Sequence, residues 1–264
     1  MIFSYRDRLI GKYMKILAID SSGLTATVAV LENDQLLAEY TTNYKKTHSQ
    51  TLVPMLDEIR KMTELDVSSI DAVAVAKGPG SFTGLRIGSA TAKGIGLALD
   101  KPVIAISTLE ALAMNVWGVD GLICPIMDAR REQVYTGVYR FIDGKQETVK
   151  EACAIAVDEL CALLDAMLDE TVLFLGDGVP VYREQIDNKL KHSHSYAPPH
   201  MSRQRAGALA VLAAQYYKEA GLTGAGKING CSIETAAEHK PEYLRMSQAE
   251  RERSQKNVNK GNDS

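Results

Sequence analysis

The sequence predicts an α/β protein of two similar lobes, each with a mixed sheet flanked by helices. The chain has 264 residues and a mass of 28.8 kDa, which exceeds the usual size of one domain and favours one large or two smaller domains. Two successive parts of the chain each begin with strand-like alternation and continue with alternating helices and strands. This order is typical of a duplicated α/β architecture.

The first lobe is predicted to span residues 14–106. Residues 15–42 alternate as three strands, which are separated by Ser-Ser-Gly and Glu-Asn-Asp turns. A helix follows from Ser49 to Met62, and a buried strand is expected in AVAVAKG. A second helix from Thr83 to Leu99 and a strand in PVIAIS complete the lobe.

The second lobe is predicted to span residues 107–245. Its strands are expected in GLICPIMDA, EQVYTGVYRF and TVLFLGDG, and the first two of these suggest a hairpin. The predicted helices cover 109–116, 157–168, 181–190 and 203–220, and the last has the option of packing back on the first lobe. Residues 1–13 are expected to be a disordered extension or the product of an upstream start codon, and residues 246–264 a disordered tail.

Composition and spacing exclude several classes of protein. The net charge of −3 gives no global attraction to nucleic acid or to an anionic membrane. No apolar stretch approaches the ~20 residues that span a bilayer, so we expect a cytoplasmic protein without a membrane partner. The four cysteines lack CxxC spacing and the five histidines form no HxxxH or HExxH pair, which predicts reduced thiols and no metal site.

The strongest local motif is GPGSFTGLRIG, which lies between a buried strand and a helix. Its glycines let the backbone approach a ligand, and Ser81 or Thr83 can cap a helix whose N-terminal amides attract anions. The Lys-Ser/Thr pair of a Walker A motif does not follow. A tight turn that seats the helix against the sheet explains the pattern equally well. The loop residues concerned are Gly78, Gly80, Ser81, Thr83 and Gly84.

The helix after this loop is apolar on almost every side, because only Arg86 and Lys93 are charged between Thr83 and Leu99. Such a helix needs cover on both sides. Together with the helix of Ser49–Met62 it predicts a two-helix interface with another subunit, and complete burial within the chain is an equal alternative. The residues expected in this interface are Leu52, Met55, Leu56, Ile59, Leu85, Gly88, Ala92 and Ile95.

Three turns are similar to the nucleotide loops of actin-like and sugar-kinase-like ATPases. An aspartate and two serines end the first strand, a second aspartate stands at a comparable turn in the second lobe, and a glycine pair follows a later strand. Each signal is weak alone because an aspartate after a strand is commonly a turn former. Their order favours an actin-like fold with nucleotide loops that are vestigial. The residues concerned are Asp20, Ser21, Ser22, Asp128, Gly176 and Gly178.

Six segments between Met14 and Arg245 occur in the order found in one known family. GPGSFTGLRIG is highly specific, and KILAIDSS, THSQ with His48 and Gln50, VIAISTLEAL, DARREQVY and PEYLR support it. The chain thus resembles the bacterial TsaB (YeaZ) family of tRNA threonylcarbamoyladenosine biosynthesis proteins. The resemblance implies the duplicated actin-like (ASKHA, ribonuclease-H-like) two-lobe fold.

The resemblance also implies a non-catalytic subunit that forms a heterodimer with the catalytic paralogue TsaD. That pair, with the ATPase TsaE, transfers a threonylcarbamoyl group to the adenosine beside the anticodon of tRNAs reading codons that begin with A. Thr108 and Leu112 stand where the paralogue carries two metal-binding histidines, and neither side chain can replace them. The chain is then expected to need no cofactor, while the partner complex uses ATP and a metal ion. It would meet tRNA only through that complex, and a homodimer of the chain alone stays open.

One departure from the family limits what the resemblance implies. Arg131 and Glu132, followed by Gln133, replace a glycine-glutamate pair of the family, so no ligand role is carried over to that loop. Two other functions stay as alternatives. The first is a small-molecule kinase or ATPase of the actin-like fold that uses Asp20 and the glycine loops. The second is a peptidase that acts on the partner.

Overall fold

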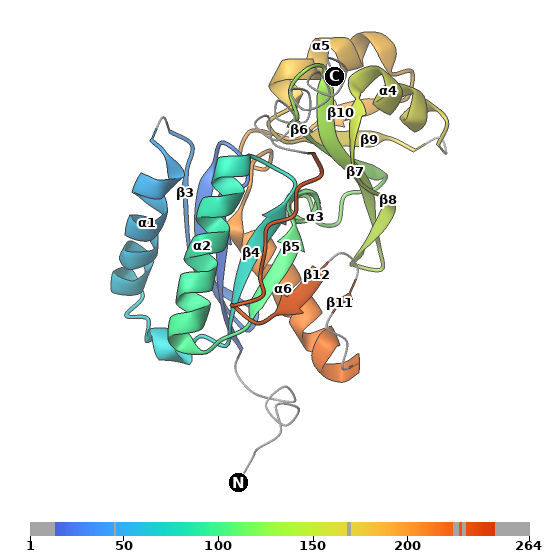
Figure 1. Cartoon of the computed structure of the whole chain (residues 1–264). Helices are drawn as coiled ribbons and strands as arrows, with labels where there is room; N and C mark the ends of the chain where they lie inside the picture. Colours follow the sequence, from blue (N-terminus) through green and yellow to red (C-terminus); the bar gives the residue numbers. More distant parts are fainter. Residues whose placement is uncertain (1–13, 45, 168–169, 224–226, 229–230, 246–264) are drawn as a thin grey trace, which may run out of the picture.

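Seven strands form the larger sheet of the computed structural model, which describes residues 14–44, 46–167, 170–223, 227–228 and 231–245. Their order is β11-β12-β5-β4-β1-β2-β3 (Figure 1). The bounds are β1 Lys15–Asp20, β2 Ala26–Glu32, β3 Gln35–Thr42, β4 Ala72–Gly78, β5 Val103–Ser107, β11 Lys227–Ile228 and β12 Cys231–Glu234. The expected extension 1–13 and tail 246–264 lie outside the described residues.

The smaller sheet has the order β10-β9-β6-β7-β8. Its bounds are β6 Leu122–Asp128, β7 Gln133–Ile142, β8 Lys145–Ala156, β9 Val172–Leu175 and β10 His194–Tyr196. In each sheet the first two strands of the lobe pair antiparallel, as do the second and third, while the first and fourth pair parallel. This repeated topology confirms the predicted duplicated α/β fold.

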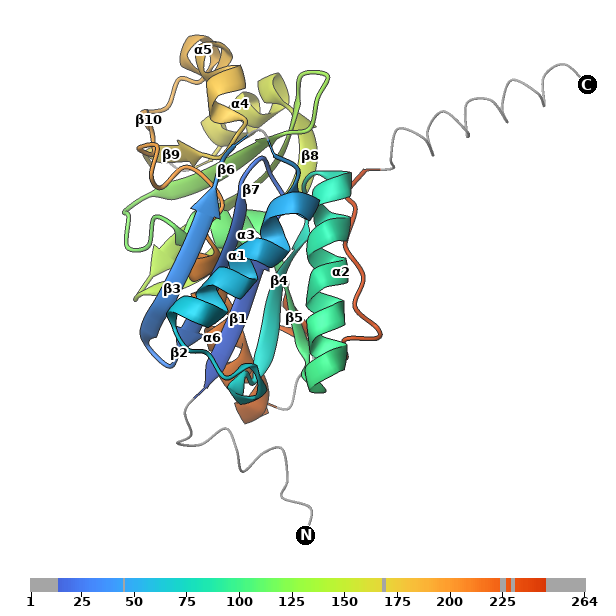
Figure 2. The ribbon, with the colours of Figure 1, turned by 90° about the vertical axis from the view of Figure 1, so that its left-hand side faces the viewer.

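Helices cover both faces of the larger sheet, and α4 Val157–Asp165 and α5 Val179–Lys189 pack on the smaller one. The remaining bounds are α1 His48–Met62, α2 Phe82–Leu99, α3 Thr108–Met114 and α6 Ala206–Thr223, with a 3-10 turn η2 at Val67–Ser69. Because side chains alternate along a strand, Leu17 and Ile19 of β1 pack under α1 and α2, whereas Ile16 and Ala18 pack under α6. Figure 2 shows α1 and α2 side by side on their face of the sheet.

Two helices cross between the lobes. The helix α3 follows the larger sheet, yet Leu109 and Leu112 pack on Ile123 and Tyr139 of the smaller one. Conversely, α6 and β12 follow the smaller sheet and belong to the larger, where β12 pairs with β5. The chain therefore returns to the larger sheet from Ala206 onward, within the residues 107–245 that were assigned to the second lobe with the option that the helix of residues 203–220 packs back on the first.

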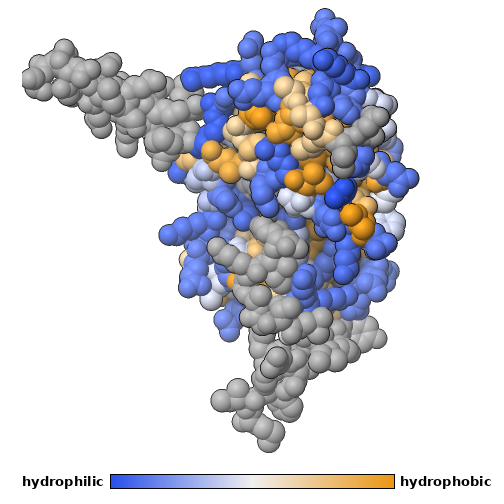
Figure 3. All heavy atoms as spheres, turned by 90° about the vertical axis from the view of Figure 1, so that its right-hand side faces the viewer, coloured by the Kyte–Doolittle hydropathy of each residue, from blue (hydrophilic) through white to orange (hydrophobic). Residues whose placement is uncertain are grey.

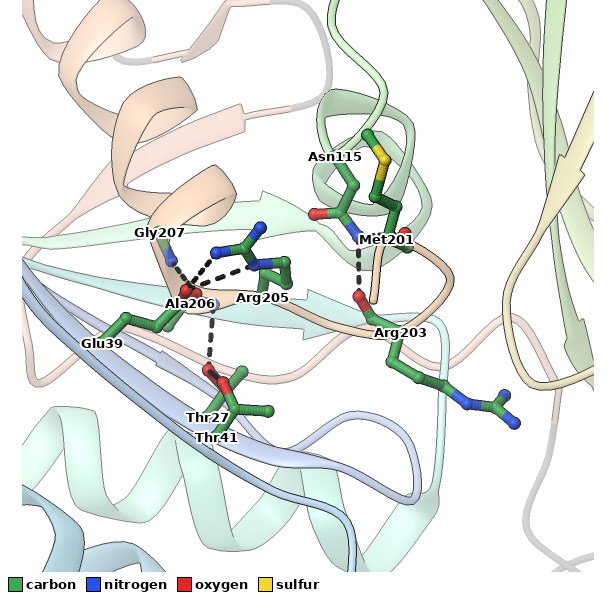
Figure 4. Close-up of polar contacts among 9 residues, drawn as sticks. All are labelled: Thr27, Glu39, Thr41, Asn115, Met201, Arg203, Arg205, Ala206 and Gly207. Atoms are coloured by element: carbon green, nitrogen blue, oxygen red, sulfur yellow. Dashed lines mark hydrogen bonds and ion pairs between the residues drawn. The ribbon is translucent and has the colours of Figure 1, made fainter. Parts of the chain in front are cut away.

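The return point is fixed by polar contacts at the start of α6 (Figure 4). Glu39 of β3 accepts hydrogen bonds from Arg205 Nη2 (2.6 Å), Arg205 Nε (3.2 Å) and the backbone N of Gly207 (2.8 Å). The backbone N of Ala206 donates to Thr27 Oγ1 at 3.1 Å. These acceptors satisfy amides that a helix N-terminus leaves without intrahelical partners, and the carboxylate complements the helix dipole.

Candidate functional site

The turn after β1 satisfies its polar groups from within the chain. The Asp20 side chain is buried, and its Oδ1 accepts hydrogen bonds from the backbone N of Ser22 (2.8 Å) and from Ser22 Oγ (2.6 Å). Burial raises the pKa of Asp20 to about 6, and the Ser22 hydrogen bonds and nearby His48 oppose this shift only in part. Asp20 is therefore a turn former that occupies an amide of the kind that binds phosphate.

The glycine loop packs directly on this turn. The backbone N of Ser81 donates to Ser22 O (2.6 Å), and Ser21 Oγ donates to Gly84 O (2.9 Å). A Cβ at Gly80 would lie 2.3 Å from Ser22 O, and one at Gly84 would lie 2.1 Å from Ser21 O. Neither position admits a side chain, so the loop fits backbone against backbone, as in the structural-turn interpretation of the motif.

The start of the loop and its helix cap are equally constrained. Gly78 has a φ of +128°, and a Cβ there would lie 2.2 Å from Glu242 O. Ser81 Oγ accepts a hydrogen bond from the backbone N of Gly84 at 3.3 Å and caps α2, while Thr83 is exposed in its first turn. The glycines and the serine thus seat α2 on the sheet.

The second lobe repeats this internal pairing. Asp128 Oδ1 accepts hydrogen bonds from the backbone N of Arg130 (2.8 Å) and from Tyr182 Oη (3.0 Å). The backbone N of Asp128 donates to Asp177 Oδ1 at 3.2 Å. Burial raises the pKa of Asp177, although this hydrogen bond and nearby Arg203 lower it in part. The amides of this turn are therefore also engaged within the chain.

The glycine pair after β9 lets its loop approach β6. A Cβ at Gly176, which has a φ of +108°, would lie 2.1 Å from Ile126 O. Gly178 N donates to the same carbonyl at 3.0 Å, and a Cβ at Gly178 would stand 3.0 Å from it. Both glycines serve close packing on β6, and Asp177 between them lines the cleft described next.

The loops of the two lobes face each other across a cleft of about 770 Å³. Most of the predicted loop residues meet here, whereas Asp20 and Ser21 lie buried behind Ser22. The predicted residues that line the cleft are Ser22, Gly80, Ser81, Thr83, Gly84, Leu85 and Asp128. Lining residues that the sequence analysis did not single out as site residues include Tyr44, Lys46, Tyr135 and Tyr243.

The C-terminal segment 241–245 also lines this cleft and connects the lobes. Arg86 Nε of α2 donates to Tyr243 Oη at 3.2 Å, and Arg245 Nη1 donates to Ala129 O in the second lobe at 2.7 Å. The sequence motif PEYLR marked this segment for its resemblance alone. Only the fold reveals its bridging contacts, because its partners are more than 100 residues away in the sequence.

The loop that departs from the family pattern keeps a backbone that glycine favours. Arg130, Arg131 and Glu132 have φ values of 66°, 57° and 57°. Each left-handed residue that is not glycine costs about 1–2 kcal/mol. These three residues therefore hold the turn in a conformation that glycine would adopt at lower cost.

The structure places most of the expected interface residues in the interior. Leu52, Ile59, Leu85, Gly88 and Ala92 are buried between the two helices and the sheet. They serve the core of the chain, the alternative that the sequence left open, and have no outward surface to offer a partner. The three expected residues that keep partial exposure are Met55, Leu56 and Ile95.

A different set of residues forms the outward face of α1 and α2. Ala90, Gly94 and Ala98 recur at every fourth position of α2 and are exposed, and a Cβ at Gly94 would meet nothing within 4 Å. Leu97 beside them and Val53 on α1 are each 60% exposed. We call these five residues the α1/α2 face.

Neither a metal cluster nor a membrane helix is found in the part of the chain that the structure describes. No group of three or more His, Cys, Asp or Glu side chains among those residues is placed to hold a metal ion. No helix there is long and apolar enough to cross a membrane. Thr108, where the resemblance implies a histidine of the paralogue, is buried at the start of α3.

Comparisons with known proteins agree with this fold. A family model described as "TsaD: tRNA N6-adenosine threonylcarbamoyltransferase" matches residues 35–252. The chain is 36% identical over 237 residues to the tRNA threonylcarbamoyladenosine biosynthesis protein TsaB of Bacillus subtilis, covering 90% of this chain and 96% of that protein. It is also 36% identical over 129 residues to TsaB of Escherichia coli, covering 48% of this chain and 55% of that protein.

A solved structure gives the same result at the level of the fold. YeaZ from Pseudomonas aeruginosa superposes with a TM-score of 0.70 at 24% identity, covering 88% of this chain and all of that one. Sequence identity along nearly the whole chain, the family match and the shared topology lead to one assignment. The chain belongs to the TsaB (YeaZ) family of tRNA threonylcarbamoyladenosine biosynthesis proteins and has their actin-like ATPase fold.

Proposed function

We propose that this chain is the non-catalytic subunit of the complex that transfers a threonylcarbamoyl group to the adenosine beside the anticodon of tRNAs reading codons that begin with A. It acts in the cytoplasm as a scaffold that forms a heterodimer with the TsaD-like catalytic paralogue and stabilises its active arrangement. It meets the TsaE-like ATPase and tRNA through that complex, and any homodimer that it forms without the partner would use the same face. ATP and the metal ion belong to the partner complex.

The observation that supports a non-catalytic role is the internal closure of both nucleotide-type turns. Phosphate binding at such turns uses free backbone N–H groups. Here Asp20 engages the amide of Ser22, Asp177 engages that of Asp128, and the glycine loop packs on the carbonyls of the first turn. One amide of each turn is therefore already engaged within the chain, which supports a role other than phosphate binding.

The α1/α2 face supports the heterodimer. Small residues every fourth position on an exposed helix face let a second helix approach closely, and the exposed Leu97 and Val53 add apolar area that a partner would cover. On the side of the molecule that carries β8, apolar residues lie in patches divided by hydrophilic ones (Figure 3). The α1/α2 face instead lies on two neighbouring helices that pack on one sheet.

The test is size-exclusion chromatography with light scattering of the chain alone and mixed with the TsaD-like subunit of the same cell. We expect a one-to-one heterodimer that forms at the expense of any homodimer. Gly94→Arg should abolish it, because an interface that buries an unpaired charge loses several kcal/mol, on the order of 3 or more. Ala162→Arg, which places the same charge at an exposed position of α4, is the matched control.

The choice of position decides whether the experiment is informative. A charge at Ala92, within the originally expected interface, would enter the core and unfold the chain, since Ala92 is completely buried. A folded Gly94→Arg variant that keeps full affinity would contradict the interface. ATP turnover by the chain alone would favour the kinase or ATPase alternative, and cleavage of the purified partner would favour the peptidase.

A further inference from the structure

A second, smaller cavity of about 140 Å³ lies between the lobes on the far side of Gly78 and Pro79. It has room for several water molecules or for a solute of a few heavy atoms. The end of β4, the start of α3, β7, β8 and the C-terminal segment all contribute to its wall. Its polar lining includes Lys77, Glu110, Tyr139, Thr148, Glu151 and Glu242.

The charge of this wall is negative. Lys77 is the single basic residue in the lining, and its Nζ lies 2.8 Å from Glu242 Oε2 in an ion pair. Lys77 also acts on Glu110, whose pKa it lowers in part, yet the lining holds the three glutamates Glu110, Glu151 and Glu242 against this one lysine. A cation therefore fits the lining better than an anion.

Glu110 is the unusual group in the wall because it is buried and only half satisfied. Its side chain is 4% exposed, and Oε1 accepts a hydrogen bond from Tyr216 Oη of α6. Among the described residues, Oε2 has no hydrogen-bond partner. A buried carboxyl oxygen without a partner costs about 1–3 kcal/mol, and a ligand that supplies a donor recovers part of this.

The pKa of Glu110 is that of a buried carboxyl, which a bound cation would lower again by stabilising the ionised form. Burial raises it to about 7, against the opposing effect of the hydrogen bond from Tyr216. Burial and the charge of Glu110 likewise raise the pKa of Tyr139, which stays a neutral hydroxyl. The charged and titratable groups that face Glu110 from the surrounding elements are Lys77, Tyr139, Glu151, Tyr216 and Cys231.

We propose that this cavity binds the ammonium group of a small primary amine, with Glu110 as its charge partner. An ammonium has three N–H donors and no acceptor, which matches a wall of carboxylate and hydroxyl oxygens. A metal ion fits less well, since no cluster of three His, Cys, Asp or Glu side chains suited to one is found among the described residues. The site shares only Glu242 and Leu244 with the lining of the cleft of the nucleotide-type loops, and the proposal does not depend on the proposed heterodimer.

The probe for this site is ethanolamine, with ethylene glycol as its uncharged counterpart and potassium chloride as the inorganic cation. Binding is followed by amide NMR shifts of the full chain at constant ionic strength. We expect saturable shifts around the cavity with ethanolamine alone. Equal shifts with ethylene glycol or potassium, or none with ethanolamine, would overturn the proposal.

Variants test the role of Glu110. Glu110→Gln keeps an acceptor for Tyr216 and removes the charge, so we expect at least a tenfold loss of affinity. Glu159→Gln, at an exposed position of α4, is the matched control and should bind as the wild type does. Glu151→Gln should weaken binding while leaving Glu110 in place, which keeps the test valid if Glu110→Gln does not fold. Unchanged affinity in folded Glu110→Gln would refute the assignment.

The pH dependence gives a second readout. Because the cation binds the ionised carboxylate, affinity should fall on the order of 30-fold between about pH 8 and about pH 5.5, across the Glu110 pKa of about 7. Affinity that does not change over this range would contradict Glu110 as the charge partner.

Discussion

Replacement of Glu39 by alanine tests how the chain returns to the first lobe. The carboxylate accepts from the backbone N of Gly207 and from two nitrogens of Arg205, and its side chain is 12% exposed (Figure 4). Loss of the acceptor leaves the buried Gly207 amide unsatisfied, at about 1–3 kcal/mol. Loss of the partly exposed Arg205 pair and of the charge at the helix N-terminus adds about 0.5–1 kcal/mol.

We therefore expect Glu39→Ala to lower the free energy of unfolding by about 2–3 kcal/mol, which corresponds to a fall in Tm of about 5–10 °C. Urea unfolding followed by circular dichroism measures the change. Glu39→Gln keeps an acceptor for Gly207 and should lose about 1 kcal/mol. The matched control is Asp34→Ala, which removes a pair of 3.9 Å between the fully exposed Asp34 and Lys218 of the same helix, and should stay within about 0.5 kcal/mol. Equal effects of Glu39→Ala and Asp34→Ala would refute this reasoning.

Two further predictions concern the glycine loop and the buried aspartate. Gly78→Ala should destabilise the chain by on the order of 2–3 kcal/mol in urea unfolding, because of its φ of +128° and the contact with Glu242 O. Gly94→Ala, in open helical space, should instead stabilise it by up to about 1 kcal/mol, and equal effects would contradict the packing described. Asp20 has a folded pKa of about 6 against 3.8, so its contribution to stability is present below about pH 4 and is lost as the pH rises through about 6. The free energy of unfolding of Asp20→Asn should not show this decrease with pH, which is on the order of 2–3 kcal/mol in the wild type. A variant with the same pH profile as the wild type would exclude Asp20 as its cause.

Hydrophobic periodicity predicted most of the fold, with one large omission. The strand β8 spans 12 residues, Lys145–Ala156, and no strand was expected there. It lies at the edge of its sheet, where charged side chains such as Glu147 and Lys150 prevent pairing with other chains and mask the apolar alternation of a strand. Periodicity detects strands that bury a face, so a charged edge strand escapes it.

The sequence shows that α2 is apolar on almost every side, but it does not show which segments of the chain pack against it. Residues after β12 supply part of it, since Lys93 Nζ donates to the carbonyls of Ala237 and His239 at 2.9 and 3.0 Å. A Cβ at Gly96 would lie 2.8 Å from Ala236 Cβ. These partners are about 140 residues away, a separation that local patterns do not bridge.

The positions of the candidate loops could be predicted from the sequence, but the contact between them could not. Spacing placed Asp20 and the glycine motif after buried strands, as the structure has them. That the two segments pack on each other depends on the parallel pairing of β1 with β4, which sets their ends side by side. The sequence alone does not decide between a phosphate-binding loop and a structural turn. The two interpretations differ in whether the glycine loop packs on the turn after β1, and only the fold shows that contact.

Modification of tRNA by the reconstituted complex tests the proposed non-catalytic role most directly. The measurement is formation of threonylcarbamoyladenosine by the TsaD-like and TsaE-like subunits with this chain, with its Asp20→Asn variant, or with neither. We predict that modification requires the chain and that folded Asp20→Asn supports it as well as the wild type does, because Asp20 serves the turn. Full modification without the chain, or loss of modification with a folded Asp20→Asn that still binds its partner, would contradict the proposal.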